Sequence, residues 1–189
     1  QLLQGLVFTF TTRNTRSIRL SMEWLKPWGI SGMDQDDING VYRDKIILDH
    51  CRNPRNQTQL QLPDKTGEAI NPFCGDEVHL DINFDVSGHV SDVFVMAEGC
   101  AINQASSSIL SEAIKGLSLA DMLKLYRKFT CVMNGNTKLK QLDSSFFDDL
   151  SVMYGVRKFP VRIKCVLLSW MALYKIVSKT VLPELPLRP

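Results

Sequence analysis

Four residues of this chain carry side chains that can bind a metal ion or attack sulfur, and their placement suggests one shared site. They are three cysteines and an aspartate one glycine beyond the first of them: Cys74, Asp76, Cys100 and Cys165. Cys100 lies between an expected strand and an expected helix, and Cys165 falls in the expected first turn of the final helix. A thiol beside a helix N-terminus is favoured as thiolate, the form that binds metals and acts as a nucleophile. Three sulfurs and one carboxylate oxygen suit tetrahedral zinc and can also hold iron.

The residue types and spacing also allow a plainer interpretation. Free cysteine is among the most buried residue types and often only packs, and an aspartate such as Asp76 can stabilise a turn by bonding nearby backbone groups. The remaining cysteines and the histidines match no site pattern, and we expect them to have surface or structural roles: Cys51, Cys131, His50, His79 and His89.

Composition excludes several classes of protein. The 189 residues carry a formal charge of +2, so the chain lacks the strongly basic balance expected of a nucleic-acid-binding protein. Five widely spaced cysteines form a poor disulfide framework and favour a reducing compartment, for which we expect the cytoplasm. The most apolar stretch, residues 166–177, is interrupted by Ser169 and Lys175 and is shorter than the roughly 20 residues that span a membrane.

The elements that must position the four residues begin with a hairpin. From Val78 to Val86 every even position is apolar, which predicts a strand with one solvent-exposed face. Ser87–Gly88 predicts a turn, and His89 to Glu98 a second strand that is apolar on both faces and more buried. Residues 55–70 are expected to form a loop with one short strand near its end.

Helical patterns flank this hairpin. A first helix is expected to begin at Asp34–Asp37 and to stop before Pro54, and Ser144–Ser145 is expected to open a shorter one. Three longer helices are expected after the hairpin: one after Cys100 that ends at Gly116, one capped by Ser118 with Asp121, and one from about Arg162 to Lys179. This order predicts an α+β domain over residues 34–182, with a small antiparallel sheet of about three strands and helices packed on one face.

The two ends of the chain are set apart from this domain. Residues 1–33 contain Arg13, Arg16 and Arg19 and no acid before Glu23, a composition similar to that of a transit peptide. They can also be an upstream extension, because Met33 could be a natural start. We expect this segment to be disordered or non-native; as a transit peptide it would indicate an organelle instead of the cytoplasm. Residues 183–189 are expected to be a C-terminal tail.

Three motifs resemble those of the IscU/SufU/NifU N-terminal family of iron–sulfur assembly proteins. They are NPFCGD at 71–76, GCAINQASSSIL at 99–110 and FPVRIKCVLLSWMAL at 159–173, and YRDKIILDHCRNPRN at 42–56 is similar to the family's first helix. The resemblance covers residues 41–177. The 65-residue interval from Cys100 to Cys165, with Lys164 where IscU-type members usually have histidine, is similar to the SufU branch.

The resemblance implies a fold, a cofactor and partners. It implies an IscU/SufU-like domain with Zn²⁺ held by Cys74, Asp76, Cys100 and Cys165. It also implies a pyridoxal-phosphate-dependent cysteine desulfurase of the SufS type as the source of persulfide sulfur, and downstream cluster assembly or carrier proteins as recipients. The chain would then be a sulfurtransferase-like accessory protein and not a conventional enzyme.

Alternatives remain for the acceptor and for the metal. Cys74, on a glycine-flanked loop, is our expected sulfur acceptor, and Cys165 is the alternative, because Lys164 could lower its pKa unless that lysine is simply solvated. The cysteines could instead hold a transient [2Fe–2S] cluster or iron, as in a scaffold. A purely structural zinc in an interaction domain is the third hypothesis.

Overall fold

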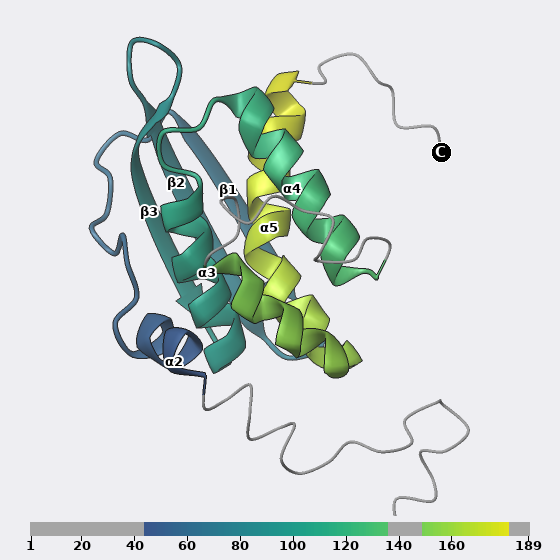
Figure 1. Cartoon of the computed structure of the whole chain (residues 1–189). Coiled ribbons are helices and arrows are strands. Elements are labelled where there is room, and N and C mark those ends of the chain that lie inside the picture. The colour runs from purple at the N-terminus through teal and green to yellow at the C-terminus, as the bar shows by residue number, and fades with distance from the viewer. Residues whose placement is uncertain (1–43, 136–148, 182–189) are drawn as a thin grey trace, which may run out of the picture. The chain divides into compact units, whose positions relative to one another are not determined.

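The protein forms a three-stranded antiparallel sheet with helices on one face (Figure 1). The structure, a computed structural model, describes residues 44–135 and 149–181. The strands are β1 (Lys65–Asn71), β2 (Asp76–Phe84) and β3 (Val90–Glu98), in the order β1-β2-β3. The helices are α2 (Lys45–Arg52), α3 (Ala101–Ala113), α4 (Leu119–Met133), the 3₁₀ helix η4 (Leu150–Lys158) and α5 (Pro160–Val181). The predicted fold class is therefore confirmed.

The predicted hairpin is present and its alternating pattern decides which face meets the helices. Val78, Leu80 and Ile82 are buried at 3% exposure or less, whereas Glu77, which precedes them, is exposed and the intervening His79 is half-buried. The strand ends at Phe84 and not at Val86, which is fully exposed in the turn. The expectation that both faces of the second strand are buried is correct for Phe94 but wrong for Met96, whose side chain lies on the open face.

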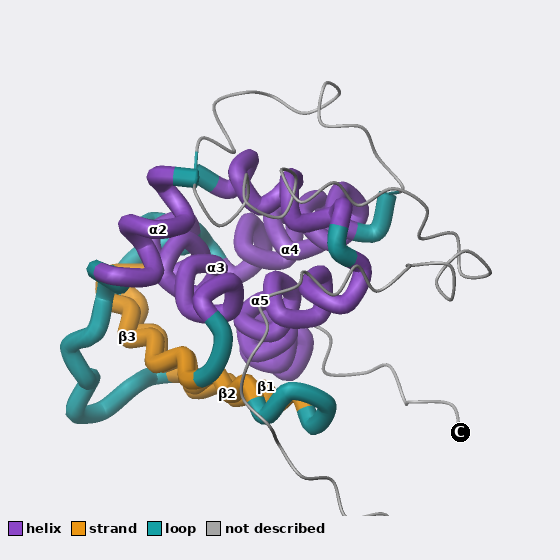
Figure 2. The backbone as a smooth tube through the Cα atoms, turned by 90° about the horizontal axis from the view of Figure 1, so that it is seen from below, coloured by secondary structure: helices purple, strands orange, loops and turns teal. Residues whose placement is uncertain are grey.

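The helices form layers against one side of the sheet (Figure 2). Helix α5 packs on β1 and β2, and α3 packs on β3, while α2 packs on α3. Helix α4 packs on α5, where the Phe129 and Trp170 rings stack with centroids 4.0 Å apart. Within the described ranges, no helix combines the length and apolar character needed to cross a membrane.

Two helices begin at other residues than the sequence predicts, and one expected helix lies outside the described residues. The helix that carries His50 begins at Lys45 and not at Asp34–Asp37, because the Asp44 side chain accepts the first backbone N–H groups; residues 34–43 lie outside the described residues. The helix expected at Ser144–Ser145 and the domain boundaries at 33 and 182 also lie outside them. The last helix begins at Pro160, so Cys165 lies in its second turn and not in its first.

Candidate metal centre

A tight turn between β1 and β2 presents Cys74 to solvent. The backbone carbonyl of Asn71 accepts the N–H groups of Cys74 at 3.3 Å and of Gly75 at 2.9 Å, and the Asn71 side-chain oxygen accepts the Phe73 N–H at 3.2 Å. Gly75 has a φ of 71°, which a residue without Cβ adopts at low cost. The sequence NPFCG thus forms a compact turn, and the Cys74 side chain is exposed at its tip.

Asp76, the first residue of β2, lies buried at 2% exposure and is the centre of the cluster. Its Oδ1 accepts the backbone N–H of Cys100 at 3.1 Å, and its Oδ2 accepts the Cys100 thiol, also at 3.1 Å. Burial alone would raise the pKa of Asp76, but hydrogen bonds from Cys100, Cys165 and Cys74 outweigh it and hold the pKa below its usual value. The carboxylate is therefore charged and faces all three thiols.

Two residues that the sequence did not single out hold this arrangement together. Gly99 has a φ of 115°, and a Cβ at this position would overlap the carboxylate of Asp76. Asn103, which is fully buried, donates to the carbonyl of Glu98 at 2.9 Å and to that of Glu77 at 3.3 Å, so it ties the start of α3 to β3 and β2. The glycine before Cys100 was a visible signal; the role of Asn103 depends on tertiary contacts that its position in a helical stripe does not reveal.

The pKa values of the Cys100 and Cys165 thiols are raised, whereas the sequence led us to expect thiolates. Burial, and then the charge and hydrogen bonding of Asp76, raise the pKa of Cys100, although it occupies the N-cap position of α3. Burial, Cys100 and Asp76 together raise the pKa of Cys165 to about 12. The expected thiolate preference is therefore wrong for the metal-free cluster, because these sulfurs face a buried carboxylate and, for Cys165, because the helix N-terminus is more than one turn away.

The four residues converge as the sequence predicted. Ligand atoms of Cys74, Asp76 and Cys165 lie within 4.8 Å of one another, and Cys100 joins them through its 3.1 Å contact with Asp76. Thiols with raised pKa values around a charged carboxylate hold protons that a divalent cation can replace. The donor set therefore fits zinc chemistry, with Cys74 at the solvent side and the other three residues toward the interior.

Three residues near the cluster in sequence or in type lie outside it: Lys164, Cys51 and Cys131. Lys164 is exposed, and its Nζ lies 4.7 Å from the centroid of the exposed Phe73 ring. The main causes that raise the pKa of Cys165 are burial, Cys100 and Asp76. Cys51 is half-buried and its thiol donates to Gln104 at 3.5 Å, while Cys131 is exposed on α4, so neither joins the cluster.

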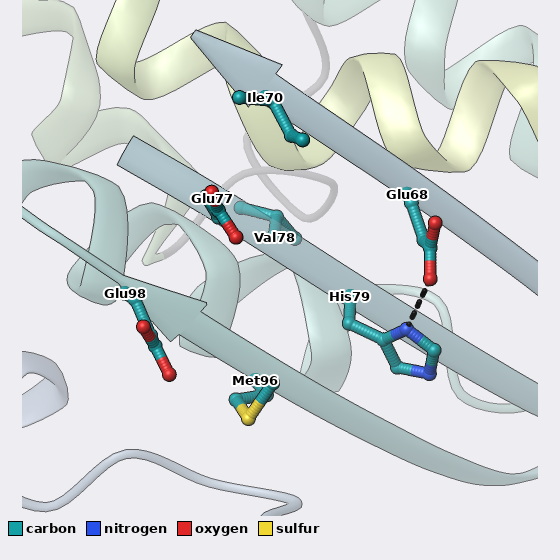
Figure 3. A pocket seen from close by; sticks show the side chains of 7 residues that line it. All are labelled: Glu68, Ile70, Glu77, Val78, His79, Met96 and Glu98. Atoms are coloured by element: carbon teal, nitrogen blue, oxygen red, sulfur yellow. Dashed lines mark hydrogen bonds and ion pairs between the residues drawn. The ribbon is translucent and has the colours of Figure 1, made fainter. Parts of the chain in front are cut away.

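His79 lines a pocket on the open face of the sheet (Figure 3). It is lined by acidic, apolar and histidine side chains of all three strands: Glu68, Ile70, Glu77, Val78, His79, Met96 and Glu98. The His79 ring contacts Glu68 through Nδ1 and Asp81 through Nε2, each at 3.0 Å. Burial works against the charged ring, but these hydrogen bonds prevail and raise the pKa of His79. The imidazole is thus a structural bridge between two carboxylates.

The fold and the cluster define a class of small α+β protein in which strand and helix ends gather three cysteines and one aspartate. The chain belongs to the family of the NifU-like N-terminal domain, whose profile matches residues 41–166. It is 38% identical over 144 residues to the zinc-dependent sulfurtransferase SufU of Bacillus subtilis strain 168, covering 76% of this chain and 93% of the relative.

Two further comparisons agree with this assignment. The chain is 31% identical to the iron–sulfur cluster assembly scaffold protein IscU of Streptococcus pyogenes serotype M1, covering 76% of this chain and 86% of the relative. It superposes with a TM-score of 0.66 on the crystal structure of a proposed iron–sulfur cluster assembly scaffold protein for the SUF system from Fervidobacterium islandicum AW-1. The two chains are 29% identical, and the match covers 74% of this chain and 98% of the other. The family resemblance read from the motifs is therefore confirmed.

Proposed function

We propose that this protein accepts persulfide sulfur from a cysteine desulfurase at Cys74, within a zinc site formed by Cys74, Asp76, Cys100 and Cys165, and passes the sulfur on for iron–sulfur cluster assembly. The observation that carries the proposal is the difference in exposure among the sulfurs. Cys74 is exposed on its turn, whereas Cys165 is 2% exposed and Cys100 is intermediate. Only an accessible sulfur can meet the persulfide of a second protein, so Cys74 is the acceptor and Cys165 the less accessible alternative.

The transfer is a displacement without net oxidation. The Cys74 thiolate attacks the terminal sulfur of the partner's cysteine persulfide, a new S–S bond forms, and the old S–S bond breaks to leave the partner's cysteine as thiolate. Bound zinc supplies a positive charge that favours deprotonated sulfur at neutral pH. Gly99 leaves room for the buried Asp76 carboxylate, and the hydrogen bonds of Asn103 to the carbonyls of Glu77 and Glu98 fix the start of α3, where Cys100 lies.

A second candidate function is that of a scaffold that transiently holds a [2Fe–2S] cluster. The observation that favours it is the similarity to an IscU scaffold protein along most of the chain. One oxygen among three sulfurs is consistent with transient holding, because iron–sulfur clusters prefer thiolate ligands. A purely structural zinc is less well supported, since Cys74 is exposed at the tip of a glycine-containing turn.

The partner is, on this proposal, a pyridoxal-phosphate-dependent cysteine desulfurase of the SufS type. The chain in turn delivers sulfur to downstream cluster assembly or carrier proteins. All five cysteines are free, which suits a reducing compartment. We place the reaction in the cytoplasm, or in an organelle if residues 1–33 act as a transit peptide.

The test begins with the full chain purified anaerobically and analysed for zinc, iron and acid-labile sulfide. It is then incubated with a SufS-type desulfurase and cysteine, and sulfide release and persulfide on the chain are measured. We expect about one zinc ion per chain, faster desulfurase turnover, and persulfide at Cys74. Cys74→Ser should abolish the stimulation. Cys131→Ser removes another exposed cysteine and should leave it unchanged.

The outcomes separate the three functions. Zinc lost on Asp76→Ala or Cys100→Ser, but kept on Cys51→Ser, supports the cysteine–aspartate site. An iron–sulfur chromophore with stoichiometric sulfide and no zinc would favour the scaffold function. Zinc that stays bound while the chain neither carries persulfide nor affects the desulfurase would leave a structural zinc domain.

A further inference from the structure

A second group of potential metal ligands lies on the opposite part of α3 from the cysteine cluster. His50 of α2, Glu112 of α3 and Asp149, which precedes η4, each offer one ligand atom, and these atoms lie within 4.8 Å of one another. Glu112 is 12 residues beyond Cys100 on the same helix, which corresponds to roughly 18 Å along the axis. The two groups are therefore separate sites.

His50 is held rigidly with one ring nitrogen turned toward both acids. Its side chain is 3% exposed, and its Nδ1 lies 2.8 Å from the hydroxyl of Ser108 on α3. The same hydroxyl accepts the backbone N–H of Arg55 at 2.8 Å, and its second lone pair can accept an Nδ1–H. In that tautomer, Nε2 presents a lone pair toward the carboxylates. A hydrogen bond on the far nitrogen is the usual support of a metal-binding histidine.

The distances fit ligands around an ion better than a direct hydrogen bond. His50 Nε2 lies 3.7 Å from Asp149 Oδ2 and 3.9 Å from Glu112 Oε2, and it makes no hydrogen bond to any residue in the described ranges. Hydrogen bonds would need about 3.2 Å or less. Two ligand atoms at about 2.1 Å from a tetrahedral ion are about 3.4 Å apart, so small rotations of the two acids would complete the geometry.

The charges around this cluster favour a cation. Three carboxylates, those of Asp49, Glu112 and Asp149, surround one guanidinium, that of Arg55. Arg55 is engaged mainly by Asp49 in a short contact and reaches Glu112 only at 4.0 Å.

We propose that His50, Glu112 and Asp149 form a second metal site, which binds a divalent ion of the Mn²⁺, Fe²⁺ or Zn²⁺ class through one nitrogen and two carboxylate oxygens. Imidazole with carboxylates suits these ions, and no sulfur takes part. The acid side chains are 48% and 51% exposed, so the site is open to solvent and water completes the coordination. A bound ion would join α2, α3 and Asp149, the residue directly before η4.

The test uses the full chain and Mn²⁺ alone, because Mn²⁺ prefers oxygen and nitrogen over thiolate ligands. Bound Mn²⁺ is measured by the loss of the free-ion electron paramagnetic resonance signal, and its place by paramagnetic broadening of the His50 ring protons. The site variants Glu112→Gln and Asp149→Asn change exposed side chains and are expected to fold. Glu98→Gln and Asp92→Asn, exposed acids on β3, are the matched controls.

We expect one saturable Mn²⁺ site, an affinity lowered on the order of tenfold or more in each site variant, and unchanged affinity in both controls. Asp76→Ala should also leave Mn²⁺ binding unchanged, which separates this inference from the proposed function. The inference is overturned if Mn²⁺ does not bind, if the His50 protons are not broadened, if the site variants bind as the controls do, or if Asp76→Ala removes the binding.

Discussion

The carboxylate of Asp76 lies 3.1 Å from the thiol sulfur of Cys100, although the two residues are 24 positions apart in the chain. Asp76 begins β2 and Cys100 follows β3, so the antiparallel pairing of these strands brings them together. The contact couples their titration: the thiol helps to hold the pKa of Asp76 low, and the carboxylate helps to hold the pKa of Cys100 high. The metal-free cluster therefore keeps its interior sulfurs protonated.

The first prediction concerns the reactivity of these sulfurs. Asp76→Asn removes the charge at nearly constant shape, so the pKa of Cys100 and of Cys165 should fall, and both thiols should be alkylated several-fold faster near pH 8 in the metal-free chain. Mass spectrometry of alkylated peptides over time measures this. Asp85→Asn, in the exposed turn before β3, is the control and should leave the alkylation rates of Cys100 and Cys165 unchanged. Unchanged rates at both cysteines would show that burial alone protects them.

The second prediction concerns Gly99. Gly99→Ala places a Cβ against Asp76 and strains a φ of 115°, whereas Gly116→Ala strains a φ of 73° with no atom within 4 Å of the new carbon. We expect Gly116→Ala to lower the free energy of unfolding by about 1 kcal/mol, and Gly99→Ala to lower it further and to reduce zinc retention. Urea unfolding and metal analysis of both variants measure the difference. Equal effects of the two substitutions would contradict the contact with Asp76.

Local patterns predicted the elements well because their signals lie within a few residues. The alternation through Val78, Leu80 and Ile82 predicted a strand, and its helix-facing side is the side that the pattern indicated. The sequence predicts that the last helix begins at about Arg162, after Pro160, whereas α5 begins at Pro160 itself. Proline is favoured in the first helical turn, where its missing N–H is not needed. That shift moved Cys165 from the first turn to the second.

The environment of the site could not be predicted in the same way. The family resemblance named Cys74, Asp76, Cys100 and Cys165 together, and they do converge. The raised pKa values of Cys100 and Cys165 arise from burial and from Asp76, which depend on how β2, β3 and α5 pack. His50 likewise has no potential metal ligand at a suitable spacing in the sequence, although Glu112 and Asp149 lie near it in space.

A third prediction concerns the N-terminus of α4. Ser118 Oγ accepts the N–H of Asp121 at 3.2 Å, which is one half of the predicted capping box. The Asp121 carboxylate accepts the Ser118 hydroxyl at 2.7 Å, whereas a full capping box would have it accept the Ser118 backbone N–H. Ser118→Ala should therefore lower the free energy of unfolding by about 1 kcal/mol. Ser91→Ala, on the exposed face of β3, is the matched control and should have little effect. If urea unfolding shows the same stability for both variants, the cap contributes nothing.

The last prediction concerns the pH dependence of stability through His79. Its pKa in the folded protein is raised above the ordinary value of 6.5 by Asp81 and Glu68, which outweigh burial. The bridge therefore contributes stability fully below about pH 6.5, and this contribution is lost as the pH rises through the raised pKa. His79→Gln should destabilise the protein more at about pH 5.5 than at about pH 9. Urea unfolding at both pH values measures this, with His89→Gln in the exposed turn as control. If the loss caused by His79→Gln is the same at both pH values, the two carboxylates do not hold the ring in its charged form.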